Sequence, residues 1–410
     1  MFAAMTREAW LTFAICWIGG MACGAIASAG PTYLPDIMAW QQGVMPLSMA
    51  EFGSMLQSMF LFGWIVGGIG FGLWADLRDR LPVLGGVVLA ATMFTAASVL
   101  VHDQYALIAL RCAAGVFVGA AMVVSTTIGS EILPHTRRPL MMGILANSYA
   151  VGIVLSGALQ SAAIPYTHAV LLFLVFNIPM LPAFSTRVGA CIVADREVSR
   201  AGVMRKLGSM RREVAVGVTV YGCMLIVLWT SFTWLPTWLS QTFPGGDAGV
   251  AIRGAVMVAL GMGAIVGSLL VAPLVHLTGR INSLIICYAG VIILSTFLYG
   301  VLPASSTHAI ITVSALSIFF GMSQALMSFY VPELFPSAVR ATAVGICFNL
   351  GRTVTAIAVL QVGFIAEALG GFQRTLLMAT SMLVVGLLTA LYARRSFGTV
   401  TPSAEQFTTS

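Results

Sequence analysis

Long apolar segments, separated by short polar stretches, recur along the whole chain. A helix of about 20 apolar residues spans the roughly 30 Å hydrocarbon core of a bilayer. Twelve such segments can be drawn, at 9–34, 50–75, 82–101, 104–130, 139–162, 165–186, 213–240, 250–276, 282–302, 307–331, 339–365 and 372–393. The pattern predicts an all-α polytopic membrane protein with twelve transmembrane helices, because lipid-exposed backbone must make its hydrogen bonds within the segment.

Two short stretches carry the same residues 202 positions apart. The matching pairs are Glu131 and Glu333, Pro134 and Pro336, Arg138 and Arg340, Gly143 and Gly345, and Asn147 and Asn349. Duplicated halves are typical of transporters that bind their substrate between the halves. We expect two pseudo-symmetric six-helix bundles over 1–186 and 213–395, a cytoplasmic linker over 187–212 and a disordered cytoplasmic tail over 396–410.

Composition and charge agree with a membrane protein. Hydrophobic residues make up 59% and charged residues 8% of the chain, whereas a soluble domain carries about 25% charged residues. With the N-terminus inside, every Lys and Arg falls on the inner side except Arg111, Arg253, Arg352 and Arg374, none of which lies in an outer loop proper. The positive-inside rule then places both termini in the cytoplasm of a bacterial inner membrane. The net charge of +6 is therefore a topology signal, not a nucleic-acid footprint.

A signal peptide is the alternative for the first segment, since Arg7 precedes an apolar run that ends at Ala27-Ser28-Ala29. That run is longer than a typical signal core, and its removal would break the symmetry of the halves. The seven cysteines show no CxxC pair and no metal-ligand spacing, so we expect no metal and no cofactor. The scattered His and Cys offer no nucleophile–base pair at a common depth, which argues against a membrane enzyme.

Three motifs together resemble the major facilitator superfamily. Residues 72–80 (GLWADLRDR) are similar to that family's glycine–aspartate–basic loop, with Leu77 where a basic residue is usual and Asp79 where a glycine is usual. Residues 111–119 (RCAAGVFVG) are similar to its arginine–glycine signature. Residues 332–336 (PELFP) and 233–239 (TWLPTWL) resemble its organic-acid and sugar proton symporter branches. The resemblance implies two six-helix bundles that rock around a central site, and a monomer is expected.

Arg352 and Arg111 are the candidate ligands for an anionic substrate. Twelve residues at about 1.5 Å rise put Arg352 about 18 Å beyond Arg340, and Arg111 lies about 12 Å below Asp103, so the two arginines share a depth. A guanidinium matches a carboxylate with two parallel hydrogen bonds. The alternatives are that Arg352 anchors its helix and that Arg111, as the resemblance implies, is a structural or coupling arginine bonded to backbone.

Polar and aromatic residues at mid-depth complete the predicted pocket: Gln57, Asn147, Tyr149, Trp234, Gln324 and Asn349. Buried amides and hydroxyls are stable only when they are paired, so a bound substrate is one explanation for them. Hydrogen bonding between helices is the alternative explanation.

A second group of charges lies at the inner ends of the predicted helices. It comprises Asp76, Glu131 and Glu333 as acids, with Arg78, Arg80, Arg138 and Arg340 as bases. We expect ion pairs among them that hold an inner gate shut and part when it opens. The alternative is static capping of helix ends. The second copy of the loop, at 272–280, lacks the aspartate, so the two halves of the gate are expected to differ.

Together these features predict a secondary active transporter for a small organic anion, either a carboxylate or an aromatic acid. No Asp or Glu is predicted at mid-depth, so we expect the proton to enter on the substrate's own carboxyl group or to be replaced by anion exchange. A sugar carrier or a drug/proton exporter of the same fold is the alternative. A receptor or scaffold, unlike these, would show no alternating access.

Overall fold

The computed structural model describes residues 6–40, 47–75, 79–133, 138–184, 208–244, 247–301, 303–336 and 339–397. These residues are overwhelmingly helical and include no strand, and twelve of the helices are long and apolar enough to cross a membrane. The predicted fold class is confirmed. The predicted inner loop at 76–78, most of the linker and most of the tail lie outside the described residues.

The N-terminal half contains the first six spans. They are α1 (Arg7–Trp40), α2 (Met49–Ala75), α3 (Arg80–Ala97) with the 3-10 turn η1 (Ser98–Leu100), α4 (Gln104–Ile132), α5 (Arg138–Ser161), and α6 (Tyr166–Leu172) continued by η2 (Phe173–Phe184). Within this half α2 packs on α4 and α1 packs on α5. The helix α1 continues through Trp40, so the outer loop that the sequence placed from residue 35 begins later than expected.

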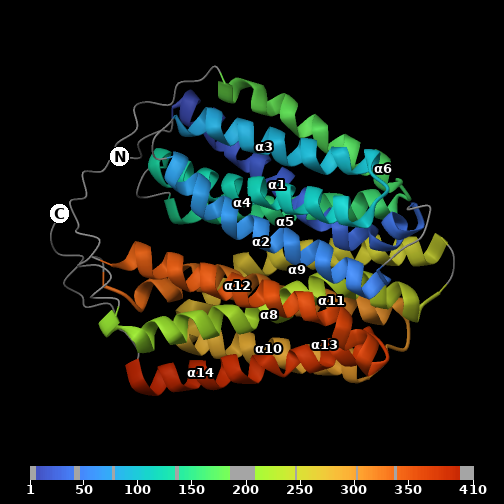
Figure 1. Cartoon of the computed structure of the whole chain (residues 1–410). Coiled ribbons are helices and arrows are strands. Elements are labelled where there is room, and N and C mark those ends of the chain that lie inside the picture. Colours follow the sequence, from blue (N-terminus) through green and yellow to red (C-terminus); the bar gives the residue numbers. More distant parts are fainter. Residues whose placement is uncertain are drawn as a thin grey trace.

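The C-terminal half repeats this arrangement. Its helices are α8 (Arg211–Thr242), α9 (Asp247–Thr278), α10 (Arg280–Gly300), α11 (Ser306–Glu333), α12 (Arg340–Leu369), α13 (Phe372–Thr380) and α14 (Met382–Phe397). Here α9 packs on α11 and α8 packs on α12, as α2 on α4 and α1 on α5 do in the first half. Figure 1 shows the halves as two layers of roughly parallel helices, with the start of α1 and the end of α14 at the same end.

We call the end where α1 begins and α14 ends the terminal end, and the opposite end the distal end. The halves meet along two helix pairs, α2 with α12 and α5 with α9. At the distal end the backbones of the paired helices lie so close that no side chain fits at the glycines between them. A Cβ on Gly157 would lie 2.7 Å from the carbonyl oxygen of Gly254, and one on Gly363 would overlap the backbone of Ala50. Small residues permit such close backbone approach.

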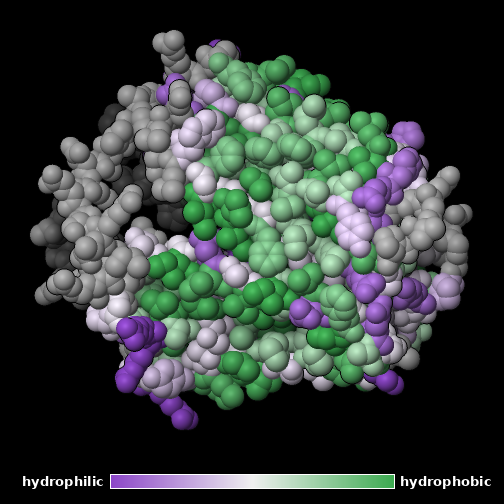
Figure 2. All heavy atoms as spheres, viewed as in Figure 1, coloured by the Kyte–Doolittle hydropathy of each residue, from purple (hydrophilic) through white to green (hydrophobic). Residues whose placement is uncertain are grey.

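At the terminal end the same helices lie farther apart. A Cβ on Gly143 of α5 or on Gly345 of α12 would meet no atom within 4 Å. The space-filling view is hollowed between the halves at this end, and an apolar band covers the middle of the molecule (Figure 2). The halves are therefore closed against each other at the distal end and open at the terminal end.

Candidate substrate-binding site

Arg352 lies between the two halves near their middle. Its guanidinium carbon is 5.8 Å from the ring centroid of Trp64 on α2 and 6.0 Å from that of Tyr221 on α8. Among the described residues it forms neither an ion pair nor a hydrogen bond. A cation over aromatic faces is attracted by the ring quadrupoles, but its hydrogen-bond donors stay unused. The Arg352 guanidinium thus lies over aromatic rings with no hydrogen-bond acceptor among the described residues.

Aromatic rings from both halves surround this position. The Trp64 ring lies 5.8 Å from that of Tyr149 on α5 and 6.1 Å from that of Trp229 on α8, measured between centroids. On the other side, Tyr221 lies 4.4 Å from Phe348 of α12. Flat rings at these distances form walls that suit a planar organic ligand. Sequence reasoning did not single out Trp64 and Tyr221, although both lie at helix mid-depth.

Arg111 has a different role in the structure. Its two terminal nitrogens donate hydrogen bonds of 2.5 Å to the carbonyl oxygens of Ile26 and Ala27 on α1. Pro31 has no N–H, so the Ala27 carbonyl has no partner in its own helix, and a proline also disturbs the bonds of the preceding turn. Arg111 supplies the missing donor to Ala27 and also donates to the neighbouring Ile26 carbonyl. The structural alternative is therefore the one that the geometry of Arg111 supports.

The two arginines still lie close together along the membrane direction. The Arg111 guanidinium is 4.2 Å from the ring centroid of Phe60, and Arg352 faces Trp64 on the same helix. Four residues separate these rings, which is about 6 Å along α2. Tyr149 lies within electrostatic reach of both guanidinium groups. The expected common depth thus holds to within about one helical turn.

Besides Trp234, three of the predicted pocket residues carry buried polar atoms without a partner. These atoms are Nε2 of Gln57, the hydroxyl of Tyr149 and Nε2 of Gln324. A buried unpaired donor costs free energy that a bound ligand recovers when it supplies the acceptor. Gln57 and Trp64 are seven residues apart on α2, so they lie on the same face of the helix. Gln57 and Tyr149 are therefore the strongest candidates to assist Arg352.

The other three predicted pocket residues have partners or lie elsewhere. Asn147 accepts a 2.7 Å hydrogen bond from Ser268 of α9, which is the helix–helix bonding considered as an alternative. Asn349 donates to the Gly345 carbonyl of its own helix at 2.9 Å. Trp234 is fully buried and stacks on Phe372 with 4.2 Å between centroids.

Trp234 also faces the closed distal end. The ring edge of Trp234 lies where a Cβ on Gly53 of α2 would be, at 2.7 Å, so this tryptophan fills the contact between the halves. Its Nε1 has no partner. The structure therefore places Trp234 in the distal closure and not beside Arg352.

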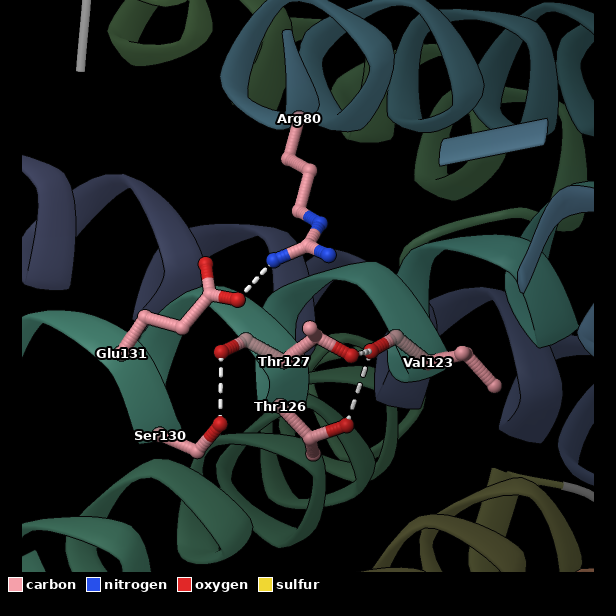
Figure 3. Close-up of polar contacts among 6 residues, drawn as sticks. All are labelled: Arg80, Val123, Thr126, Thr127, Ser130 and Glu131. Atoms are coloured by element: carbon pink, nitrogen blue, oxygen red, sulfur yellow. Dashed lines mark hydrogen bonds and ion pairs between the residues drawn. The ribbon is translucent and has the colours of Figure 1, made fainter. Parts of the chain in front are cut away.

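In the described part of the chain each half has one ion pair at its terminal end, and only the pair in the N-terminal half joins two predicted gate charges. Arg80 of α3 pairs with Glu131 of α4, and Arg280 of α10 pairs with Glu333 of α11. In Figure 3 the hydroxyls of Thr126, Thr127 and Ser130 bond to carbonyls of their own helix, and Glu131 turns away from them toward Arg80. These pairs tie helices within a half and do not connect the halves.

The remaining gate residues divide into two groups. Arg340 donates a 3.1 Å hydrogen bond to the carbonyl oxygen of Phe335, so it caps the preceding turn. Asp76 and Arg78 lie outside the described residues, as does the side chain of Arg138. Among the described residues no ion pair joins the halves at the terminal end.

An ion pair between the halves does occur at the distal end, and sequence reasoning missed it. Arg253 of α9 donates a 2.6 Å hydrogen bond to Asp36 of α1, and the Ser48 hydroxyl at the start of α2 bonds to Glu367 of α12. The sequence contained a signal for this pair, because Arg253 was one of four arginines not placed on the inner side. Asp36 was at a similar predicted distance from the outer face. Neither residue has a partner close in sequence.

Two helical halves that meet around a central cation, with one end closed and the other open, define the class of secondary membrane transporters. Comparison with known proteins agrees. A sequence model of the Major Facilitator Superfamily matches residues 12–359, and the chain belongs to this superfamily. It is therefore a multi-pass membrane transporter and not an enzyme, as the motifs predicted.

Individual relatives and solved structures share at most a quarter of their residues with the chain in the three comparisons that follow. The chain is 25% identical to a gallate transporter of Pseudomonas putida, over 84% of this chain and 82% of that protein. It is also 25% identical to a cis,cis-muconate transport protein of Acinetobacter baylyi, over 85% and 86%. The crystal structure of the nucleoside transporter NupG superposes with a TM-score of 0.75 at 13% identity, covering 94% of this chain and 99% of that one. This last similarity shows the fold alone.

Proposed function

We propose that the protein moves a small organic anion, a carboxylate or aromatic acid, across the bacterial inner membrane by alternating access. The observation that carries the proposal is the unpaired guanidinium of Arg352 between aromatic rings of both halves. A charge at this depth is costly unless it meets a polar cavity or a partner. An organic anion supplies that partner, and the names of the gallate and muconate relatives support this substrate class.

The geometry suggests how such a substrate is held. The carboxylate accepts two parallel hydrogen bonds from Arg352 of the C-terminal half. The organic body lies against Trp64 and Tyr221, and its remaining oxygen atoms accept hydrogen bonds from Gln57 and Tyr149. Because these groups belong to different halves, the substrate binds to both halves at once. A ligand held in this way favours movement of one half relative to the other.

We further propose that the terminal end faces the cytoplasm, as the distribution of Lys and Arg predicts. The structure is then the inward-facing state, open at the terminal end and closed at the distal end. The inner gate must form elsewhere in the cycle, and Asp76, Arg78 and Arg138 stay candidates for charges that join the halves there. The pairs of Arg80 with Glu131 and Arg280 with Glu333 keep each half rigid while it moves.

The coupling of transport follows from the charges near the site. Asp36, Glu131 and Glu333, the acids that form ion pairs in the described part of the chain, all lie toward helix ends and none lies beside Arg352. We propose that the proton enters on the substrate's own carboxyl group or that a second anion is exchanged, so no acidic side chain is needed at the centre.

Uptake into proteoliposomes tests the function. Purified protein is reconstituted, and uptake of radiolabelled gallate, cis,cis-muconate, a sugar and an organic cation is measured with and without an inward proton gradient. We expect the acids alone to accumulate and to raise the melting temperature of the detergent-solubilised protein. Stabilisation by the sugar or the cation, with no effect of the acids, would establish the sugar carrier or the drug exporter instead.

A further inference from the structure

An ion pair between a buried arginine and a half-buried aspartate joins the two halves at the distal end. The side chain of Arg253 is 7% exposed and that of Asp36 is 34% exposed. Asp36 also accepts a 2.9 Å hydrogen bond through its second oxygen from the amide of Gln160 on α5. The carboxylate is therefore held from two sides, once by its own half and once by the other half.

The groups around this pair leave donors unused. Nε of Arg253 is buried without a partner, and so is the hydroxyl of Tyr33, which lies within electrostatic reach of both Asp36 and Arg253. Asp36 is the acid with which Arg253 pairs in the described part of the chain. The cluster thus keeps two buried hydrogen-bond donors that its single carboxylate does not pair.

Opening of the distal end must separate this pair. Asp36 and Gln160 belong to the N-terminal half and move together, so the carboxylate keeps its amide partner. Arg253 belongs to the C-terminal half and loses the carboxylate. A guanidinium that loses its partner in a narrow, low-dielectric cleft is a strong attractor for anions. A substrate carboxylate has the same charge and the same two acceptor oxygens as the Asp36 side chain, so it can take its place.

We propose that Arg253 is a second anion-binding position, at which a carboxylate arriving at the distal end replaces Asp36 before it passes to Arg352. The proposal rests on the proposed function, namely anion uptake with the distal end outside. In the inward-facing state Asp36 occupies Arg253 and closes the entrance. In the outward-facing state the incoming carboxylate occupies it, so distal opening is favoured when substrate is present.

A matched pair of variants separates anion binding from closure. Asp36→Asn removes the ion pair but keeps Arg253, whereas Asp36→Asn/Arg253→Gln removes the pair and the cation. Both variants lose the closing contact equally. This is checked with a reporter cysteine at Ser54, which is fully buried between α2 and α12 at the distal end, and a membrane-impermeant maleimide in a background without native cysteines.

The expected result is a KM for gallate uptake about tenfold higher in the double variant than in Asp36→Asn, with kcat little changed, because one charge-assisted contact is lost. Equal KM values in the two variants, at equal labelling of the reporter, would overturn the proposal and leave Arg253 as a closing contact only.

A second measurement does not depend on transport. A cysteine at Ser161, which packs on Gly254 beside Arg253, is labelled from outside with and without benzoate. Benzoate should slow labelling in Asp36→Asn and not in the double variant. The same slowing in both variants, or in neither, contradicts anion binding at Arg253. Failure of wild-type uptake for every acid would refute the proposed function while this measurement still decides the second position.

Discussion

Arg111 and Arg352 lie at nearly the same depth, and each faces an aromatic ring of α2, but their hydrogen-bond partners differ. Arg111 donates to two carbonyl oxygens of α1 and faces Phe60. Arg352 faces Trp64 and donates to no described group. The difference does not come from the arginines or their rings. It comes from Pro31, which leaves the Ala27 carbonyl of α1 without an N–H partner in its own helix, beside the Arg111 guanidinium.

The comparison shows that a buried arginine is a ligand for substrate only if the neighbouring backbone leaves its donors unused. A charge count alone would assign both arginines to the site. Counting hydrogen bonds separates the two: Arg111 is bonded to α1, whereas Arg352 is the arginine that we propose binds the anion, so the two are expected to show different measurable losses.

The largest expected effect is on stability, at Arg111. Arg111→Gln leaves at least one of the two α1 carbonyls without a donor, so we expect the free energy of unfolding to fall by about 3 kcal/mol. Chemical or thermal unfolding in detergent measures the loss. Arg352→Gln is the matched control and should unfold almost as the wild type does. Equal stability of the two variants would contradict the structural assignment of Arg111.

The next effect is on transport, at Arg352. Arg352→Gln should lower kcat/KM for gallate by about 100-fold, because the charged partner of the carboxylate is lost. Arg352→Lys keeps the positive charge but cannot form two parallel hydrogen bonds, so it should lower kcat/KM for gallate about tenfold. Ligand-induced stabilisation should also vanish in Arg352→Gln. Wild-type uptake by this variant would remove Arg352 from the site.

A smaller effect tests why Arg111 donates to the carbonyl oxygens of α1. Pro31→Ala restores an N–H that can reach the Ala27 carbonyl within α1. The destabilisation caused by Arg111→Gln should then be smaller by about 1 kcal/mol in the Pro31→Ala background. A double-mutant cycle of unfolding free energies measures this coupling. Strict additivity would show that the proline and the arginine are independent.

The smallest effect concerns the unpaired hydroxyl of Tyr149. Tyr149→Phe removes a hydrogen bond that we propose forms only with substrate, so KM should rise about fivefold while stability is kept or slightly raised. Tyr166→Phe is the control, because its hydroxyl is bonded to Ser98 within the N-terminal half. That variant should lose stability and keep its KM. The reverse pattern would place the substrate away from Tyr149.

Much of the architecture could be predicted from local sequence. Helix number depends on apolar length, and the division into halves depends on a repeat, so neither needs knowledge of contacts. Arg352 was also identifiable, since its depth follows from counting residues from Arg340. The first span was predicted to end at residue 34, but α1 continues to Trp40 although Pro31 and Pro35 lie inside it.

The polar pairings could not be predicted in the same way. Asn147 and Gln324 look alike in sequence as mid-depth amides, yet one bonds to Ser268 and the other has an unpaired nitrogen. Ion pairs were expected among the inner charges, and Glu131 does pair with Arg80, whereas Glu333 pairs with Arg280, which was not in the predicted set. These outcomes depend on helix rotation, which the weak amphipathicity of membrane helices does not specify.

The sequence by itself determined that this protein is a duplicated, twelve-helix transporter with a deep arginine in its second half, because bilayer thickness and chain duplication act on composition and order alone. The tertiary structure decided which arginine is free, which amides are unpaired and at which end the halves close. Those properties depend on atoms from helices far apart in the chain, and the decisive pairs, Arg111 with the Ala27 carbonyl and Arg253 with Asp36, exist only when those helices are packed.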